Sequence, residues 1–143
     1  MPSTPWTDES GVIVFADGRK VRGRGLSDPL PAGLKPEFGL YLTAKPPMPM
    51  SWETRWLRWP DFWLPRDPDE ATAAINDVFD RAPHQRVEVA CSGGTGRTGT
   101  ALACLAVIAG TGSDEAVAFV RDRYRPGAVE TPWQRRYVRR FLV

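Results

Sequence analysis

The chain has 143 residues and a formal net charge of +2, and 42% of its residues are hydrophobic and 25% charged. These values are typical of one globular domain, and the small net charge does not by itself indicate a nucleic-acid partner. The chain has two cysteines and one histidine, which exclude a disulfide framework and leave few ligands for a zinc site. The N-terminus lacks a basic-then-apolar signal sequence and the longest apolar run, 101–109, is too short to span a bilayer, so we expect a single cytoplasmic domain over residues 1–143.

The first half of the chain predicts mostly strands. Residues 1–10 are expected to form a loose tail. An N-terminal hairpin is expected over 11–25, because an apolar run is followed by an Asp-Gly turn at 17–18 and a second run. Further strands are predicted over 39–43 and 53–59, with a proline-rich connection between them.

The second half adds helices around one more strand. A capping box at 67–70 begins the first helix, a strand follows at 87–90, and an apolar helix covers 99–109. Ser113 is predicted to cap a third helix, and the last helix covers about 132–142. Because strands interleave with helices, we predict an α/β fold: a central mixed, largely parallel sheet flanked by helices.

The most informative motif is residues 91–98, Cys-Ser-Gly-Gly-Thr-Gly-Arg-Thr, which lie between a predicted strand and a predicted helix. Its glycines allow backbone N–H groups to turn toward a common centre, and such a ring of N–H groups at a helix N-terminus binds phosphate. The alternative is a glycine-rich turn with a buried, inert cysteine. We predict a phosphate-binding loop whose contacts come from Ser92, Gly93, Gly94, Thr95, Gly96 and Arg97.

Three side chains of this motif suit chemistry at phosphorus. Cys91 is placed to attack a bound phosphorus atom as a thiolate, a form that the helix dipole and nearby positive charge favour. The planar guanidinium of Arg97 can hold two phosphate oxygens. Thr98 could donate a hydrogen bond to the Cys91 sulfur and help it to leave when a phosphocysteine is hydrolysed.

A phosphate ester also needs a general acid, because its leaving oxygen must take up a proton. Residues 59–65 read Trp-Pro-Asp-Phe-Trp-Leu-Pro, a stiff aromatic loop after a predicted strand. Asp61 lies thirty positions before Cys91, which leaves room for one helix and one strand. Alone, Asp61 would be an ordinary turn aspartate; together with the cysteine loop, it is the predicted acid. For Trp59 and Trp63, core packing and a role at the loop hinge or pocket rim both stay open.

These motifs together resemble the protein tyrosine phosphatase superfamily. Residues 91–98 are similar to its signature loop and residues 59–61 to its mobile acid loop. The segments 96–100 and 125–134 resemble small atypical dual-specificity phosphatases, and the whole resemblance covers about 38–143. It implies a phosphomonoester hydrolase that acts through a phosphocysteine intermediate.

The resemblance also implies roles for single residues and a class of partner. Cys91 is then the nucleophile, Asp61 the general acid and Arg97 the phosphate clamp. Thr98 assists the departure of sulfur, and Gln134 positions the hydrolytic water. No metal or other cofactor is expected. The substrate is a phosphorylated protein or a small phosphate ester, with no nucleic-acid or membrane partner, and the expected oligomeric state is a monomer.

Some residues depart from this resemblance or have a second explanation. The family usually has a histidine before the cysteine, where this chain has Ala90, and the only histidine, His84, is expected in an exposed loop. Gln134 also fits a capping box formed by residues 131–134, which explains it without catalysis. Cys104 is expected to pack in the core; the alternative is a thiol that protects the first cysteine from over-oxidation.

Other functions stay open. The same fold could carry a non-catalytic phosphate-binding module, which Ala90 favours, or a phosphatase for phosphoinositides or other small phosphates. A rhodanese-type sulfur transferase also uses a loop cysteine but does not need Asp61. A nucleotide-binding P-loop is excluded, because residues 93–98 lack the required lysine.

Overall fold

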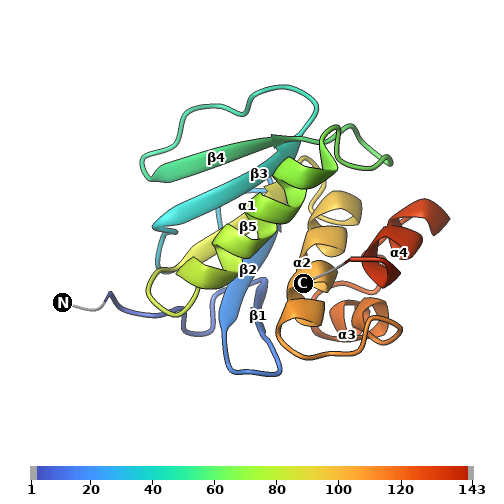
Figure 1. Cartoon of the computed structure of the whole chain (residues 1–143). Coiled ribbons are helices and arrows are strands. Elements are labelled where there is room, and N and C mark those ends of the chain that lie inside the picture. The colour runs from blue at the N-terminus through green and yellow to red at the C-terminus, as the bar shows by residue number, and fades with distance from the viewer. Residues whose placement is uncertain (1–2, 142–143) are drawn as a thin grey trace.

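The computed structural model describes residues 3–141, which form one five-stranded sheet and four helices (Figure 1). The sheet order is β1-β2-β5-β3-β4, and only the β1–β2 pair, the expected hairpin, is antiparallel. The predicted α/β fold with a mixed, largely parallel sheet is therefore confirmed. The elements are β1 (Val12–Val14), β2 (Lys20–Gly25), β3 (Phe38–Thr43), β4 (Glu53–Arg58), α1 (Pro68–Arg81), β5 (Val87–Cys91), α2 (Gly96–Ile108), α3 (Ala116–Arg123) and α4 (Pro132–Arg139).

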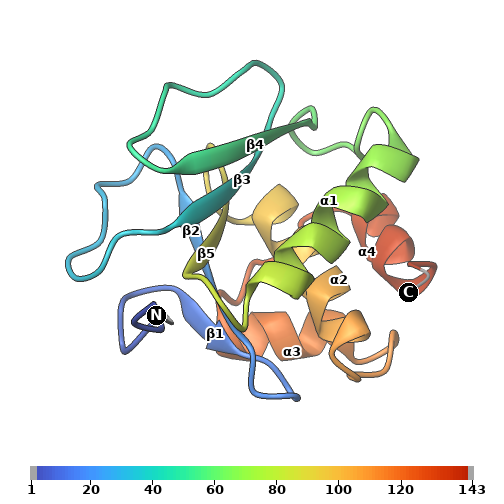
Figure 2. The same ribbon diagram turned by 60° about the vertical axis from the view of Figure 1, so that its left-hand side comes forward.

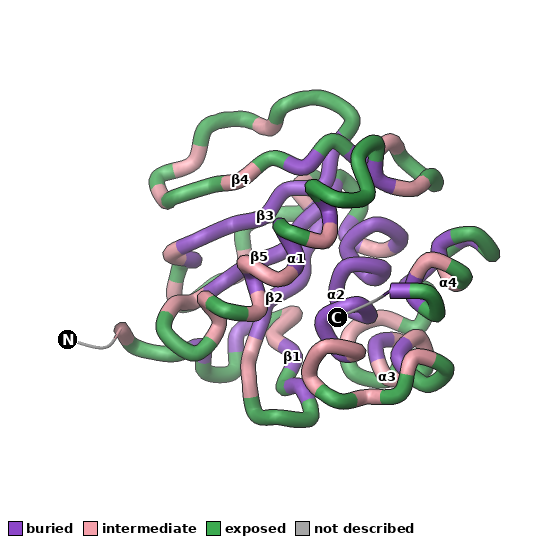
Figure 3. The backbone as a smooth tube through the Cα atoms, in the orientation of Figure 1, coloured by how far each residue is buried: buried purple, intermediate pink, exposed green. Residues whose placement is uncertain are grey.

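The described helices all lie on one face of the sheet (Figure 2). Alternate residues of β3 and β5 point toward them and share one core with the helices: Leu40, Leu42, Val87 and Val89. α2 lies inside this layer and is buried throughout residues 96–106 (Figure 3). Its N-terminus is thus fixed beside the end of β5, where the predicted phosphate-binding loop joins the two elements. No helix in the described part of the chain is long and apolar enough to cross a membrane.

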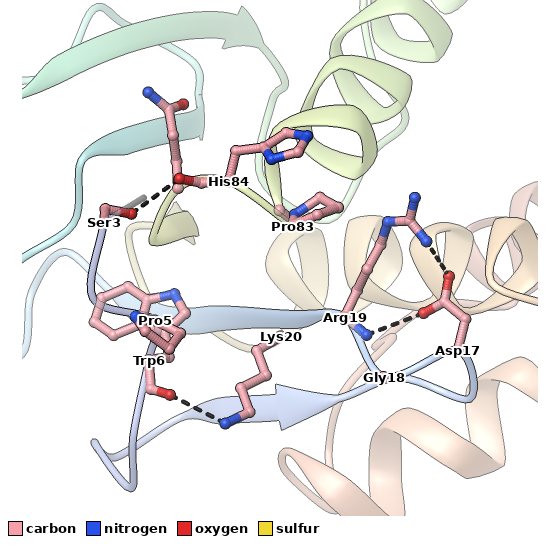
Figure 4. Close-up of a pocket in the computed structure, with 11 residues that line it drawn as sticks. Ser3, Pro5, Trp6, Asp17, Gly18, Arg19, Lys20, Pro83 and His84 are labelled. Carbon is pink, nitrogen blue, oxygen red and sulfur yellow. Dashed lines mark hydrogen bonds and ion pairs between the residues drawn. The ribbon is translucent and has the colours of Figure 1, made fainter. Parts of the chain in front are cut away.

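The prediction of a loose N-terminal tail is wrong for residues 3–10. They form neither strand nor helix, yet Trp6 is only 1% exposed and its indole N–H donates to the backbone of β5 at 3.0 Å. Lys20 Nζ donates to the Trp6 carbonyl at 3.1 Å, and Ser3 Oγ donates to the His84 carbonyl at 2.9 Å (Figure 4). Burial of a large indole with a satisfied N–H stabilises this segment against the sheet.

The starts of two helices were predicted from capping residues, with different outcomes. Asp67 caps α1, because its side chain accepts hydrogen bonds from two backbone N–H groups of the first turn. The predicted cap at Ser113 is wrong. The chain first makes a turn in which the Glu115 N–H donates to the Gly112 carbonyl at 2.9 Å, and α3 begins only after Glu115, without a side-chain cap.

The last helix is shorter than predicted. α4 ends at Arg139, whereas the predicted end near Leu142 falls outside the described residues. Phe141 is 8% exposed and its ring lies 6.2 Å from that of Tyr137. The chain turns back toward the core at this point because burying the Phe141 ring is favourable.

The face of the sheet without helices carries a buried charge cluster. Glu88 Oε1 accepts hydrogen bonds from Arg22 Nη2 at 2.6 Å and Arg24 Nε at 2.7 Å, and Oε2 accepts one from the Tyr41 hydroxyl at 2.7 Å. Burial raises the pKa of Tyr41, so its hydroxyl keeps the proton that it donates. Trp6 covers the cluster, since its ring centroid lies 4.6 Å from the Arg22 guanidinium. The N-terminal segment therefore covers the Arg22 end of the face that the helices leave open, and Trp52, whose Nε1 donates to the Tyr41 hydroxyl at 2.7 Å, lies at the other end.

Glu88→Gln is expected to lower the free energy of unfolding by about 3–5 kcal/mol, because it leaves two buried guanidinium groups without a counter-charge. Urea denaturation of both proteins measures this difference. Glu53→Gln is the matched control: Glu53 pairs with Arg81, but its side chain is 58% exposed, so a loss of about 1 kcal/mol or less is expected. Equal losses in the two variants would contradict a special role for the buried cluster.

Candidate active site

The predicted phosphate-binding loop starts at Cys91, the last residue of β5, and ends in the first turn of α2. The loop rests on the end of β2, and its turn requires a glycine. Gly94 has φ of +76°, and a Cβ atom at this position would lie 2.4 Å from the backbone nitrogen of Gly25. Any larger residue would be strained and would push the loop away from β2.

The peptide groups of this loop share one orientation. Every backbone carbonyl of residues 91–96 accepts a hydrogen bond from a group outside the ring. In a planar trans peptide the next N–H points the opposite way, so the N–H groups face inward. No hydrogen bond among the described residues uses the N–H groups of residues 92, 93, 95 and 96, and these can bind an anion together. The donors to the carbonyls are Leu26, Ser27, Tyr124, Arg125, Gly99 and Thr100.

Cys91 and Arg97 lie at the two ends of this ring and are both buried. Cys91 is 2% exposed, and its Sγ accepts a hydrogen bond from the Gly94 N–H at 3.2 Å. Arg97 is 4% exposed; its Nη1 donates to the Trp59 carbonyl at 3.1 Å, and its Nη2 lies 3.4 Å from Asp61 Oδ1. Arg97 Nε has no hydrogen-bond partner among the described residues. The guanidinium therefore keeps an unused donor for an anionic ligand.

The predicted acid loop reaches the same edge of the sheet. β4, β3 and β5 are parallel neighbours, so their carboxyl ends lie together, and the loop follows β4 directly. Trp59 is fully buried, and its backbone N–H donates to the Thr43 carbonyl at 3.0 Å. Its indole N–H donates to the Trp63 carbonyl at 2.7 Å, so Trp59 both packs in the core and closes the acid loop. The Asp61 side chain is 58% exposed and faces Arg97. The fold thus brings Asp61 to the cysteine loop across the separation expected from the sequence.

Thr98 and Gln134 make no contact that shows their predicted roles. Thr98 is fully buried, and its Oγ1 forms no hydrogen bond with Cys91 Sγ or any other described atom. The capping box is confirmed: Gln134 Oε1 accepts from the Thr131 N–H at 3.3 Å. The other end of the amide is also occupied, because Nε2 donates to the Trp63 carbonyl at 3.2 Å. Catalytic roles for Thr98 and Gln134 stay predictions.

Sequence reasoning missed two residues that hold the loop from behind. The Tyr124 hydroxyl donates to the Gly94 carbonyl at 2.5 Å, and burial raises the pKa of this tyrosine, so the donor stays protonated. Arg125 Nη1 donates to the Gly93 carbonyl at 2.8 Å and to Thr95 Oγ1 at 3.2 Å. Arg125 belongs to a segment noted for its resemblance, but no local pattern links it or Tyr124 to a loop thirty residues away.

Ala90, which stands where the family usually has a histidine, lies beside the buried charge cluster. Ala90 pairs in register with Arg24 on β2 and with Tyr41 on β3, and it is fully buried. Its small side chain thus lies between two members of the cluster formed around Glu88.

The remaining cysteine and histidine lie as expected. Cys104 is fully buried in the core on α2, and this burial raises the pKa of its thiol. Core packing is therefore its role in this structure. His84 is exposed in the loop after α1. Among residues 3–141 there is no group of three or more His, Cys, Asp or Glu side chains that could hold a metal ion.

Comparison with known proteins places this site in a family. A model of the protein-tyrosine phosphatase family matches residues 40–143, well over half of the chain. The chain therefore belongs to the protein-tyrosine phosphatase family, as its motifs indicated. This membership supports phosphatase activity, since the family acts on phosphorylated substrates.

Solved structures agree with this assignment. Tk-PTP in its active form is 27% identical, with a TM-score of 0.61 over 71% of this chain and 74% of that chain. A glycine-to-alanine mutant of Tk-PTP is 25% identical, with a TM-score of 0.62 over 73% of this chain and 75% of that chain. Kinase-associated phosphatase (KAP), with its catalytic cysteine replaced by serine, is 17% identical, with a TM-score of 0.61 over 73% of this chain and 66% of that chain. At this identity the likeness shows the fold alone. No curated protein sequence matches.

Proposed function

We propose that this protein is a cysteine-dependent phosphomonoester hydrolase of the dual-specificity type. The observation that carries the proposal is the ring of inward N–H groups between Cys91 and Arg97, with Asp61 at its mouth. An anion-binding ring alone would suit any phosphate binder. A buried thiol, a guanidinium with a free donor and a facing carboxyl group at the same ring suit phosphoryl transfer.

In the first step the Cys91 thiolate attacks phosphorus in line, so that an S–P bond forms as the ester P–O bond breaks. The loop N–H groups and Arg97 hold the three equatorial oxygens, over which the negative charge of the transferred group is spread in the transition state. Arg97 exchanges its contact with Asp61 for these oxygens, and Asp61 protonates the leaving oxygen. The product alcohol or phenol leaves, and the phosphoryl group stays on sulfur.

In the second step water attacks the phosphocysteine. Asp61, now a carboxylate, removes a proton from the water, the S–P bond breaks, and inorganic phosphate and the thiolate are released. Thr98 Oγ1 can donate to the departing sulfur, since it has no partner among the described residues. Gln134 can orient the water only if its Nε2 leaves the Trp63 carbonyl. No step requires a metal ion.

Phosphotyrosine and phosphoserine or phosphothreonine in proteins are the proposed substrates, with phosphoinositides and other small phosphates as alternatives. The Asp61 side chain is more than half exposed, so a leaving group of either kind can reach it from solvent. The reaction needs a free thiol, which a reducing compartment such as the cytoplasm maintains. We propose that the protein acts there as a monomer.

Turnover of p-nitrophenyl phosphate in the presence of EDTA tests this proposal. A sample quenched in acid during turnover is digested and analysed by mass spectrometry. The expected result is turnover that EDTA does not change, with one phosphoryl group on the peptide that contains Cys91. Loss of turnover in EDTA, or a phosphoryl group on another residue, would overturn the mechanism. Transfer of sulfur from thiosulfate would indicate a sulfur transferase instead.

A non-catalytic phosphate-binding module is the second candidate. It is favoured by Ala90, which stands where the family usually has a histidine. The same assay separates the two functions: phosphate binding measured by calorimetry, without any turnover, would indicate the binding module. Intact Cys91, Arg97 and Asp61 argue against it, because a binder does not need a nucleophile and an acid together.

A further inference from the structure

The acid loop, residues 59–65, is held by the first turn of α4. Trp133 Nε1 donates to the Phe62 carbonyl at 2.5 Å, and the Trp133 ring stacks on the Trp63 ring with centroids 5.5 Å apart and planes 24° apart. Gln134 Nε2 donates to the next carbonyl of the loop, that of Trp63. Two neighbouring residues of α4 therefore bind two neighbouring carbonyls of the loop.

These contacts are not explained by core packing. Trp63 is 61% exposed, Phe62 is 51% exposed and Trp133 is 39% exposed, so all three aromatic side chains lie at the surface and outside the core. Phe62 also has φ of +63°, a left-handed conformation that is unfavourable for a bulky residue. The hydrogen bond to its carbonyl stabilises the loop in this unfavourable conformation.

The strained residue lies next to the candidate acid. Asp61 stands between the Trp59 carbonyl, which Arg97 binds, and the Phe62 carbonyl, which Trp133 binds. The loop is therefore fixed on both sides of Asp61, by the cysteine loop on one side and by α4 on the other. The first turn of α4 is itself stabilised, because Gln134 belongs to its capping box.

We infer that Trp133 is a positioning residue that holds the acid loop against α4 and so keeps Asp61 over Arg97. The role in holding the loop stands on these contacts, whereas the role in catalysis rests on the function proposed above. Gln134 supports the same arrangement through its hydrogen bond to the Trp63 carbonyl, which opens when its Nε2 turns to water.

Three variants test the inference. Trp133→Phe removes the N–H donor and keeps an aromatic ring for stacking, Trp133→Ala removes both, and Arg136→Ala is a control on the exposed side of the same helix. Hydrogen–deuterium exchange of residues 59–65 is measured first, because it does not depend on activity. Loss of the hydrogen bond and the stacking is expected to speed exchange of the loop by roughly tenfold in Trp133→Ala, less in Trp133→Phe, and not in Arg136→Ala.

Hydrolysis of phenyl phosphate and p-nitrophenyl phosphate is then compared. Phenolate is the poorer leaving group and depends more on a well-placed acid. In Trp133→Ala we expect kcat/KM, which reports the first step alone, to fall about tenfold for phenyl phosphate, with little change in kcat/KM for p-nitrophenyl phosphate. A merely destabilised protein would lose activity on both substrates equally, and thermal unfolding of each variant identifies that case.

The two readouts separate the inference from the proposed function. Unchanged exchange of the acid loop in both Trp133 variants would overturn the inference, whatever the activity. Faster exchange with an unchanged ratio of the kcat/KM values for the two substrates would show that Trp133 holds the loop but does not position the acid. That result would also overturn the inference. A wild-type protein without turnover would refute the proposed function, while exchange would still decide whether Trp133 holds the loop.

Discussion

Cys91→Ser is expected to abolish hydrolysis of p-nitrophenyl phosphate. A serine hydroxyl is far less acidic than a thiol, and no base lies in the ring of N–H groups to activate it. The loop should keep its shape, because serine is smaller and can still accept from the Gly94 N–H that now meets Sγ at 3.2 Å. Binding of inorganic phosphate, measured by calorimetry, is therefore expected to persist while kcat falls below detection.

Cys104→Ala is the matched control, since Cys104 is fully buried in the core on α2. Its turnover is expected to match that of the wild type once the folded fraction is taken into account. Measurable hydrolysis by pure Cys91→Ser protein would remove Cys91 as the nucleophile. A variant that binds no phosphate would instead show that the sulfur is needed for the shape of the ring.

The second large effect is expected at Asp61. Asp61→Asn removes the proton donor near Arg97 and keeps a side chain of similar size, so kcat/KM for phenyl phosphate, which reports the first step, should fall by roughly two to four decades. The loss of kcat/KM for p-nitrophenyl phosphate should be much smaller, because p-nitrophenolate leaves without much help. The slope of log kcat/KM against the acidity of the leaving phenol, measured over a series of aryl phosphates, is the quantity to compare, since kcat also contains the second step, in which Asp61 is the proposed base.

Asp114→Asn serves as the control for this series, because Asp114 is an exposed aspartate in the turn before α3. It is expected to leave the slope unchanged. If Asp61→Asn hydrolyses phenyl phosphate at the wild-type rate, the general acid lies elsewhere, and Asp61 would be only an ion-pair partner of Arg97.

The features of the fold and site that could be predicted from the sequence are mostly those formed by residues close together in the chain. The loop from Cys91 to Arg97 is continuous in the chain, so its glycines and its position between a strand and a helix were visible at once. The caps at Asp67 and Thr131 act within one turn and were also found. Asp61 could be assigned because parallel strands end at one edge of a sheet, which gives a distant residue a predictable place.

The parts that could not be predicted depend on contacts between distant segments. Trp6 lies against β5, 81 residues further along the chain, and nothing in a polar N-terminal segment indicates that contact. Tyr124 meets Gly94 across 30 residues, and Trp133 meets Phe62 across 71. Ser113 failed as a cap for another reason: a turn competed for the same backbone groups, and residue type alone does not show which would prevail.

The outward carbonyls of the phosphate-binding loop have a consequence for the energetics of binding. Glycines lose the most conformational entropy when a chain becomes ordered, and a free glycine-rich loop would lose it on each encounter with a ligand. Here Tyr124 and Arg125 hold the Gly94 and Gly93 carbonyls, so that entropy is lost once, during folding. A ligand then meets a preorganised receptor, and more of its interaction energy is left for affinity and for the transition state.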